Sequence, residues 1–295
     1  MQLSLNPNAP ATSALKRANV AVLIMTLDEE KNLPACLDSV LWASEVVILD
    51  SGSRDRTVEI AKSRGCRVVT RTFDNWSAHQ NWALQNIPFG SDWLLNLDAD
   101  ETVSPELSRE IARITAQEQP DVAFRIRRRD YFSGTWLRHA TFYPTWLVRL
   151  YRPESVSFER LVNPVAVVRG STGSLHGHID HQPFSKGATH WIERHNSYST
   201  FEAIEYVKQD KLAFASSALR DPNSRRRLLK QIFSRLPGRP LLKFLYLYIA
   251  HRGFLDGAPG FHYCLLQAIY EYFISLKARE LRRDELPAHG LGRQR

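Results

Sequence analysis

Three acidic residues directly follow an apolar run in the first half of the chain: residues 93–97 are succeeded by Asp98, Asp100 and Glu101. In an extended strand Asp98 and Asp100 would project from one face, about 7 Å apart. Two like charges this close repel unless a cation lies between them. Oxygen ligands favour Mg²⁺ or Mn²⁺, which take their other ligands from phosphates and water. The pattern indicates a metal site for a nucleoside diphosphate; the alternative is an acidic turn capping a helix that begins near Pro105.

The elements that would position these acids alternate along the chain. Short β-branched runs predict strands at residues 20–25, 46–49, 67–70 and 93–97, with amphipathic helices at 29–41, 55–64 and 76–86 between them. This alternation is typical of βαβ units in a mostly parallel sheet. Ligands of such sheets bind beyond the carboxyl ends of the strands. Residues 26–30, 50–55 and 98–101 would therefore meet in one acidic, hydroxyl-rich crevice.

The pattern changes after a predicted helix at 105–117. Strands are expected at 122–127, 146–151 and 176–181, then a helix at 185–215 and two helices within 241–283, around a break at 256–260. We expect an α/β fold, a mixed sheet flanked by helices with a C-terminal helical extension. The expected divisions are a disordered lead (1–18), a catalytic domain (19–200), the helical extension (201–285) and a flexible tail (286–295).

Composition places the chain among ordinary globular proteins, with 43% hydrophobic and 24% charged residues. No run approaches the eighteen or so apolar residues that a membrane span needs. The lead lacks the apolar core of a signal peptide, and the three cysteines are far apart without C-x-x-C spacing. These features predict a cytoplasmic protein with buried, reduced thiols.

A basic segment gives much of the net charge of +8: nine Lys or Arg residues lie between Arg220 and Arg252, against one acid, Asp221. Such a segment could be a solvated helix face, a nucleic-acid patch or a contact with a membrane. It lacks a recognisable nucleic-acid motif, so no nucleic-acid partner is expected. Its Leu and aromatic residues favour an amphipathic helix on an anionic membrane surface or beside a lipid-linked substrate. They are Leu228, Leu229, Ile232, Phe233, Leu241, Leu242, Phe244, Leu245, Tyr246 and Tyr248.

The segment 50–57 follows a predicted strand and opens a predicted helix. Gly52 allows a tight turn there, and Ser53 or Asp55 could cap the helix. A turn and a cap do not account for Asp50, because an acid at the end of an apolar strand needs a partner. A ribose hydroxyl or a base edge would serve.

Together these segments resemble glycosyltransferase family 2, the inverting enzymes with a GT-A fold. The resemblance is strongest to bacterial lipopolysaccharide core β-glucosyltransferases and is looser at 253–257. It implies an enzyme that transfers a sugar, glucose, from a UDP-sugar to a lipopolysaccharide core at the cytoplasmic face of the inner membrane. The acceptor could instead be an exopolysaccharide or a polyprenyl-linked glycan. The matching segments are Val20–Met25 with Thr26-Leu27-Asp28-Glu29-Glu30, Asp50-Ser51-Gly52-Ser53-Arg54-Asp55 and Asp98-Ala99-Asp100-Glu101.

The resemblance also implies residue roles. Asp100 would be the main ligand of the Mg²⁺ or Mn²⁺ ion, Asp98 would lie near the ribose or the metal-bound phosphates, and His181 is a possible metal or phosphate contact. The ion would act as a Lewis acid on the leaving diphosphate. Gln80 stands where relatives often carry a basic residue. The residues implied for nucleotide-sugar binding are Thr26, Glu29, Asp50, Ser51, Asn81 and Asp98.

An inverting transfer needs a general base for the acceptor hydroxyl. Glu159 matches the position where relatives place an acid, and its alternative role is an ion pair with Arg160 or Arg152. Asp130 is the second candidate, because it ends a basic strand that could meet phosphates.

Two other classes compete with sugar transfer. A nucleotidyltransferase also places acids at strand ends around Mg²⁺, but such enzymes usually carry a Gly-rich basic loop after the first strand, which residues 26–31 lack. A non-catalytic membrane-bound binding module would not need Asp98, Asp100 and Glu159. Sugar transfer is the interpretation that uses all of these residues.

Overall fold

The computed structural model describes residues 17–215 and 238–284 of the chain. Predictions for residues 1–16 of the lead, for most of the basic segment, including its apolar residues at 228–233, and for the C-terminal tail lie outside these residues. Ala18, predicted to lie in the disordered lead, already begins the first strand. Within them no helix is both long and apolar enough to cross a membrane.

A nine-stranded mixed sheet forms the centre of the fold, in the order β3-β2-β1-β4-β8-β6-β11-β5, with β7 paired to β6. Its first four strands are parallel: β1 (Ala18–Thr26), β2 (Ala43–Asp50), β3 (Arg67–Thr70) and β4 (Trp93–Asp98). These confirm the four strands expected from the β-branched runs. Thr26, Asp50 and Asp98 each end a strand, so the register brings the predicted polar segments to one edge of the sheet.

Strand β1 lies between β2 and β4, and both of its faces are apolar. Val20, Val22 and Ile24 belong to one core cluster, and Ala21 and Leu23 belong to the other. Alternate side chains of a strand point to opposite faces, so a nearly continuous apolar run suits a strand covered on both sides.

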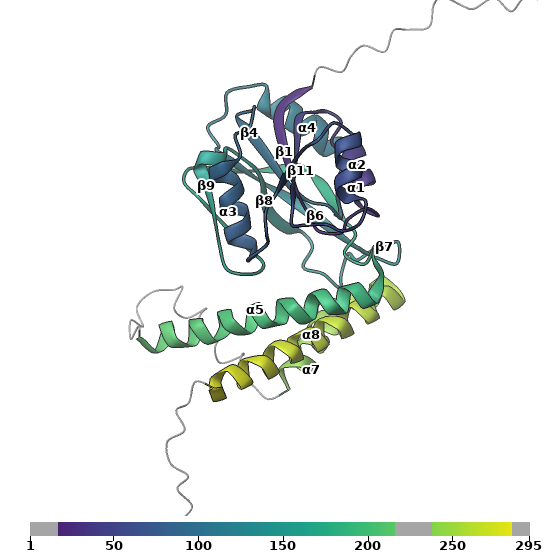
Figure 1. Cartoon of the computed structure of the whole chain (residues 1–295). Coiled ribbons are helices and arrows are strands. Elements are labelled where there is room, and N and C mark those ends of the chain that lie inside the picture. The colour runs from purple at the N-terminus through teal and green to yellow at the C-terminus, as the bar shows by residue number, and fades with distance from the viewer. Residues whose placement is uncertain (1–16, 216–237, 285–295) are drawn as a thin grey trace, which may run out of the picture.

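Helices cover both faces of the sheet (Figure 1). Core residues of α1 (Leu33–Asp38), α2 (Thr57–Ser63) and α4 (Pro105–Thr115) pack on one face, and those of α3 (Trp76–Asn86) pack on the other. The helix predicted at 29–41 is shorter than expected: residues 30–32 form a hydrogen-bonded turn before α1, and the backbone N–H groups of Glu29 and Glu30 donate to the side chains of Thr57 and Asp55. The loop before α1 is thereby tied to the start of α2.

The second half of the sheet is mixed, as predicted. Strand β8 is antiparallel to β4 and β6, while β11 is parallel to β6 and antiparallel to β5. Strands β9 and β10 form a separate antiparallel ribbon. The bounds are β5 Glu101–Val103, β6 Ala123–Phe132, β7 Thr135–Trp136, β8 Thr145–Tyr151, β9 Val156–Glu159, β10 Val165–Val168 and β11 Thr172–His181.

The C-terminal helices form a layer beside this sheet, with α5 (Gly187–Ala215) between the sheet and α8 (Gly257–Asp284) in Figure 1. Ala203 and Val207 of α5 pack on Ala278 of α8. Helix α5 runs through the boundary expected at residues 200–201, so one helix belongs to both of the expected divisions.

The chain between α5 and α8 contains α7 (Arg239–Leu245), a π-helical turn η2 (Tyr246–Ala250) and a 3₁₀ turn η3 (Gly253–Asp256). The break predicted at 256–260 falls slightly earlier, because α8 already begins at Gly257 and Pro259 is tolerated in a first helical turn. The Asp256 carboxylate accepts hydrogen bonds from the backbone N–H groups of His139 and Ala140, at 2.8 and 2.7 Å. This residue ties the helical layer to the loop after β7.

Candidate active site

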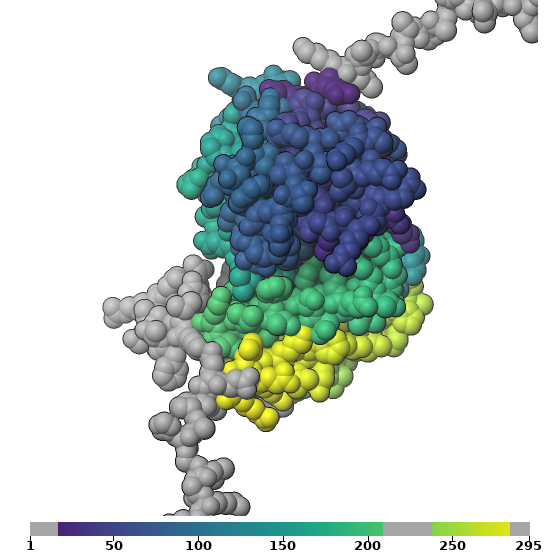
Figure 2. All heavy atoms as spheres, in the orientation of Figure 1, coloured from purple at the N-terminus to yellow at the C-terminus, as the bar shows by residue number. Residues whose placement is uncertain are grey.

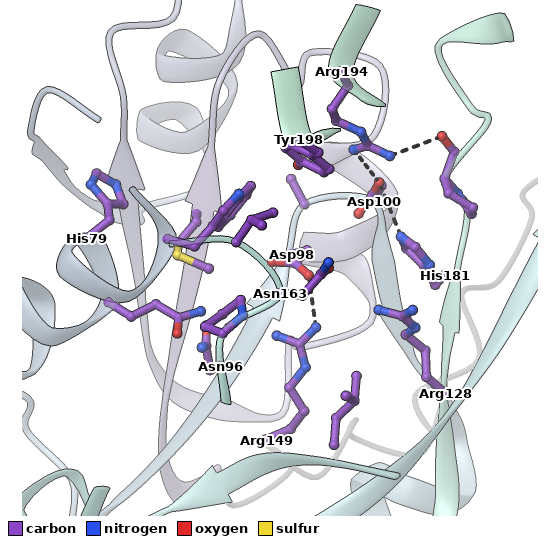
Figure 3. Close-up of a pocket in the computed structure, with 18 of the residues that line it drawn as sticks. His79, Asn96, Asp98, Asp100, Arg128, Arg149, Asn163, His181, Arg194 and Tyr198 are labelled. Atoms are coloured by element: carbon purple, nitrogen blue, oxygen red, sulfur yellow. Dashed lines mark hydrogen bonds and ion pairs between the residues drawn. The ribbon is translucent and has the colours of Figure 1, made fainter. Parts of the chain in front are cut away.

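A cavity of about 1320 Å³ opens where the carboxyl ends of β1 and β4 meet β6, β8 and α5. Its polar wall includes Thr26, Asp98 and Asp100, and its outer wall comes from α5 and α8. Figure 3 shows Asp98 and Asp100 beside Arg149, Arg194 and His181. The sheet therefore gathers the predicted acids at one cavity, which is also lined by Arg128, Arg149 and Arg194.

The acidic motif is a turn, so the expectation that Asp98 and Asp100 share one face of a strand is wrong. Strand β4 ends at Asp98, and residues 99–100 turn into β5. Glu101 stabilises the turn, because its Oε2 accepts a hydrogen bond from the Asp98 backbone N–H at 3.0 Å. The alternative of an acidic helix cap is also wrong, since Ser104 caps α4 by accepting from Leu107 N–H.

Each acid of the motif has a cationic partner. Arg149 Nη2 lies 2.8 Å from Asp98 Oδ2 and 2.7 Å from Glu101 Oε1. Asp100 Oδ2 lies 3.4 Å from Arg194 Nη1 and 3.5 Å from His181 Nε2. Burial by itself would raise the pKa of Asp100, but His181 and Arg194 hold it well below its usual value. Asp100 is therefore ionised at neutral pH.

His181 is held from its other side by Asp130, whose Oδ1 lies 2.6 Å from His181 Nδ1. Arg128 also pairs with Asp130, its Nε lying 3.0 Å from Oδ1. Burial and Arg128 oppose a proton on the imidazole, but the two carboxylates outweigh them and raise the pKa of His181 to about 9. The ring orientation fixed by Asp130 directs Nε2 toward Asp100.

Four residues predicted to bind the nucleotide sugar line the cavity: Thr26, Glu29, Ser51 and Asp98. Asp50 does not line it. Its carboxylate accepts hydrogen bonds from the Thr26 hydroxyl and from the backbone N–H groups of Gly52 and Ser53. The partner that Asp50 needs is thus supplied by the loop itself, and Asp50 shapes this end of the cavity from behind.

Asn81 also lies behind the cavity wall, where its side chain makes two hydrogen bonds, both at 2.8 Å, with the backbone of Phe158. Gln80, its neighbour, does line the cavity. Asn81 therefore joins α3 to β9.

The two candidate bases differ in position. Asp130 is buried in the cavity and paired with Arg128 and His181. Glu159 is exposed at the end of β9 and is not among the lining residues, although its neighbour Phe158 is. The expected alternative for Glu159 is wrong, because Arg160 pairs with Glu202 and Arg152 lies over the Trp93 ring.

Aromatic rings line the outer part of the cavity. Trp191 stacks on His195 with ring centroids 3.5 Å apart, and Tyr270 of α8 meets the His195 ring edge-on. Tyr198 and Trp76 close the same side. Flat apolar surfaces with polar edges suit the faces of sugar rings, which carry C–H groups between hydroxyls.

Sequence reasoning missed Arg149, Arg194 and Lys186. Arg149 had a local signal, since it is a lone charge in the strand run 147–151. Arg194 and Lys186 lie far along the chain from their partners Asp100 and Glu29, and only the packing of α5 brings them there.

Comparisons with known proteins find glycosyltransferases among the relatives of this chain. The chain is 27% identical over 276 residues to an uncharacterized glycosyltransferase of Rickettsia typhi, covering 89% of this chain and 87% of that protein. It is 26% identical over 267 residues to the lipopolysaccharide core biosynthesis glycosyltransferase LpsC of Rhizobium meliloti, covering 88% and 91% of the two chains.

Among solved structures, S. aureus TarS (residues 1–349) aligns with 90% of this chain and 92% of its own at 14% identity, with a TM-score of 0.40. The Glycosyl transferase family 2 model matches residues 21–174, more than half of the chain, and this range contains β1 from Ala21 onward, the acidic motif and Asp130. The chain is therefore a glycosyltransferase with a GT-A fold, and it belongs to glycosyltransferase family 2.

Proposed function

We propose that this glycosyltransferase transfers glucose from UDP-glucose to a lipopolysaccharide core acceptor, with inversion at the anomeric carbon. The observation that carries the proposal is the cavity that joins the acidic motif to an aromatic outer wall. The acceptor class is supported by the likeness to LpsC over most of both chains. The donor and the inversion rest on the motifs that end β1, β2 and β4.

Asp100 fits a divalent ion, and His181 would add a second ligand only after losing the proton that Asp100 and Asp130 stabilise on it. His181 Nδ1–H donates a hydrogen bond to Asp130, which leaves Nε2 facing Asp100 Oδ2 across 3.5 Å, and both His181 and Asp100 line the cavity. Within residues 17–215 and 238–284 no three His, Cys, Asp or Glu side chains converge on one point. Mg²⁺ and Mn²⁺ suit such a sparse set, because they keep ligands from phosphates and water. The ion would stabilise charge on the leaving diphosphate.

Arg194 and Lys186 are the cations proposed to attract the diphosphate itself. Each lines the cavity and is paired with an acid, Asp100 and Glu29 respectively. Asp98 is neutralised by Arg149, which supports a neutral hydrogen-bonding role for this end of the motif near the ribose.

Two carboxylates are proposed for the proton of the acceptor hydroxyl. The Glu159 carboxylate has no cationic partner among the described residues, but Glu159 is not one of the residues that line the cavity. Asp130 does line the cavity, and its carboxylate is already paired with Arg128 and His181. Replacing the base by its amide should lower the turnover of the enzyme about 10²- to 10⁴-fold and leave donor binding unchanged. Glu159→Gln and Asp130→Asn, measured side by side, distinguish the two.

The function is tested by titrating UDP-, GDP- and ADP-glucose into the protein with Mn²⁺, with Mg²⁺ and with chelator, then assaying transfer to isolated lipopolysaccharide core. We expect UDP-glucose to bind only with metal, and Asp100→Asn to weaken binding roughly 10-fold or more. Asp92→Asn, at the exposed opposite end of β4, is the matched control and should bind as the parent does. If no nucleotide sugar binds with either metal, the proposal fails.

A further inference from the structure

We propose that the outer face of the C-terminal helices docks on an anionic lipid bilayer. This apolar face consists of residues on α7, η2, η3 and α8, and the inference rests on their exposure and charge rather than on the proposed donor or acceptor. Its members are Leu241, Leu245, Ile249, Phe254, Leu255, Phe261, Leu265, Ile269, Tyr272 and Leu276.

These side chains are large, apolar and between 38% and 62% exposed. On α8 they recur at positions 261, 265, 269, 272 and 276, and on α7 and η2 at 241, 245 and 249. Intervals of three and four residues place side chains on one side of a helix. Large exposed apolar side chains that gather on one side of a helix, rather than being scattered singly, indicate a binding surface.

The face is not part of the core of the fold. The other side of α8 carries its buried residues, among them Cys264, Ala268, Ile274 and Ala278, and its cavity-lining Tyr263 and Tyr270. In Figures 1 and 2, α8 lies on the side of α5 that is remote from the sheet. Helix α8 therefore has one side toward the enzyme and one apolar side toward the surroundings.

Charge identifies the occupant. Residues 239–284, from the start of α7 to the end of α8, contain seven Lys or Arg against four Asp or Glu. Of the four acids, Asp256 is buried and Glu271 pairs with Arg239. Arg279 and Arg283 are exposed and follow Leu276 at intervals of three and seven, so they continue its side of α8.

An apolar helix face bordered by cations matches a bilayer with anionic headgroups, where such a helix lies in the interfacial plane. A second copy of the chain would instead bring two cationic surfaces together. We therefore assign the face to a membrane.

The test is flotation of the full chain, without nucleotide, on vesicles of phosphatidylcholine and on vesicles of phosphatidylcholine with phosphatidylglycerol. We expect the parent chain to bind the anionic vesicles only. The triple variant Leu265→Ser/Ile269→Ser/Leu276→Ser should bind these vesicles with an affinity about 10-fold lower or weaker still. The double variant Arg279→Glu/Arg283→Glu should lose vesicle affinity by a similar factor. Leu41→Ser, at a 68% exposed residue of the catalytic domain, is the control and should bind as the parent does.

Three results would overturn the proposal: no binding of the parent chain, equal binding to both vesicle types, or full binding by the triple Ser variant with an unchanged melting temperature. A dimer detected by light scattering that the triple variant abolishes, together with no vesicle binding, would assign the face to a second copy. Because no nucleotide is used, failure here leaves the UDP-glucose test unaffected, and the reverse also holds.

Discussion

Arg149 is the only cation within hydrogen-bonding distance of both Asp98 and Glu101 among the described residues. Glu101 is fully buried, and its burial raises its pKa while Arg149 opposes that shift. Removing one partner of a buried ion pair leaves an uncompensated charge, at a cost of about 3–5 kcal/mol. We expect Arg149→Met to lower the free energy of unfolding by this amount in urea titrations. Arg149→Lys keeps the charge and should lose less; equal stability of the Met variant would contradict the role given to Arg149.

His79 gives the fold a pH dependence. Burial, and then the charge of Arg71, lower the pKa of His79 from 6.5 to about 4, and Arg71 lies 2.7 Å from its Nδ1. The unfolded chain takes up this proton near pH 6.5 and the folded chain only near pH 4, so stability falls as pH drops through that window. Between pH 7 and pH 5 the loss from this residue is about 2 kcal/mol.

Urea unfolding at both pH values measures this loss. The decrease in the free energy of unfolding from pH 7 to pH 5 should be about 2 kcal/mol smaller in His79→Gln than in the parent. His176→Gln, at an exposed histidine, should show the parent's fall. If His79→Gln shows the parent's pH dependence, another group is responsible.

At the scale of elements, the sequence predicted best where local patterns decide. Helix α3 and strand β3 have the predicted bounds, and the four parallel strands follow their β-branched runs. Residues 29–32 carry helical periodicity but lead into α1 through a turn, and Thr57 and Asp55 of a distant segment bind the backbone there. The turn at residues 99–100 likewise involves a side chain, Glu101, that accepts a hydrogen bond from the strand end. Such hydrogen bonds between side chains and the backbone cannot be read from periodicity.

The candidate site divides in the same way. Thr26, Ser51, Asp98 and Asp100 could be predicted, since each stands at the end of a parallel strand or directly after one. Arg194 could not, because its place beside Asp100 depends on how α5 crosses the sheet.

The whole molecule depends on how the helical layer is attached to the sheet and its flanking loops, and Asp256 is one described point of attachment. Its carboxylate binds two backbone N–H groups, of His139 and Ala140. Asp256→Ala would leave both donors without this acceptor, at a cost of about 3 kcal/mol or more. We expect its Tm to fall by roughly 6–12 °C.

Asp256→Asn keeps one acceptor oxygen and should fall by less in the same thermal scans. Donor affinity should be unchanged in both variants below their Tm, because Asp256 does not line the cavity and α8 stays packed on α5 in the folded state. An unchanged Tm in Asp256→Ala would mean that the packing of α5 on α8 alone holds the layer in place. A Tm that falls together with donor affinity would mean that the cavity and the helical layer unfold as one cooperative unit.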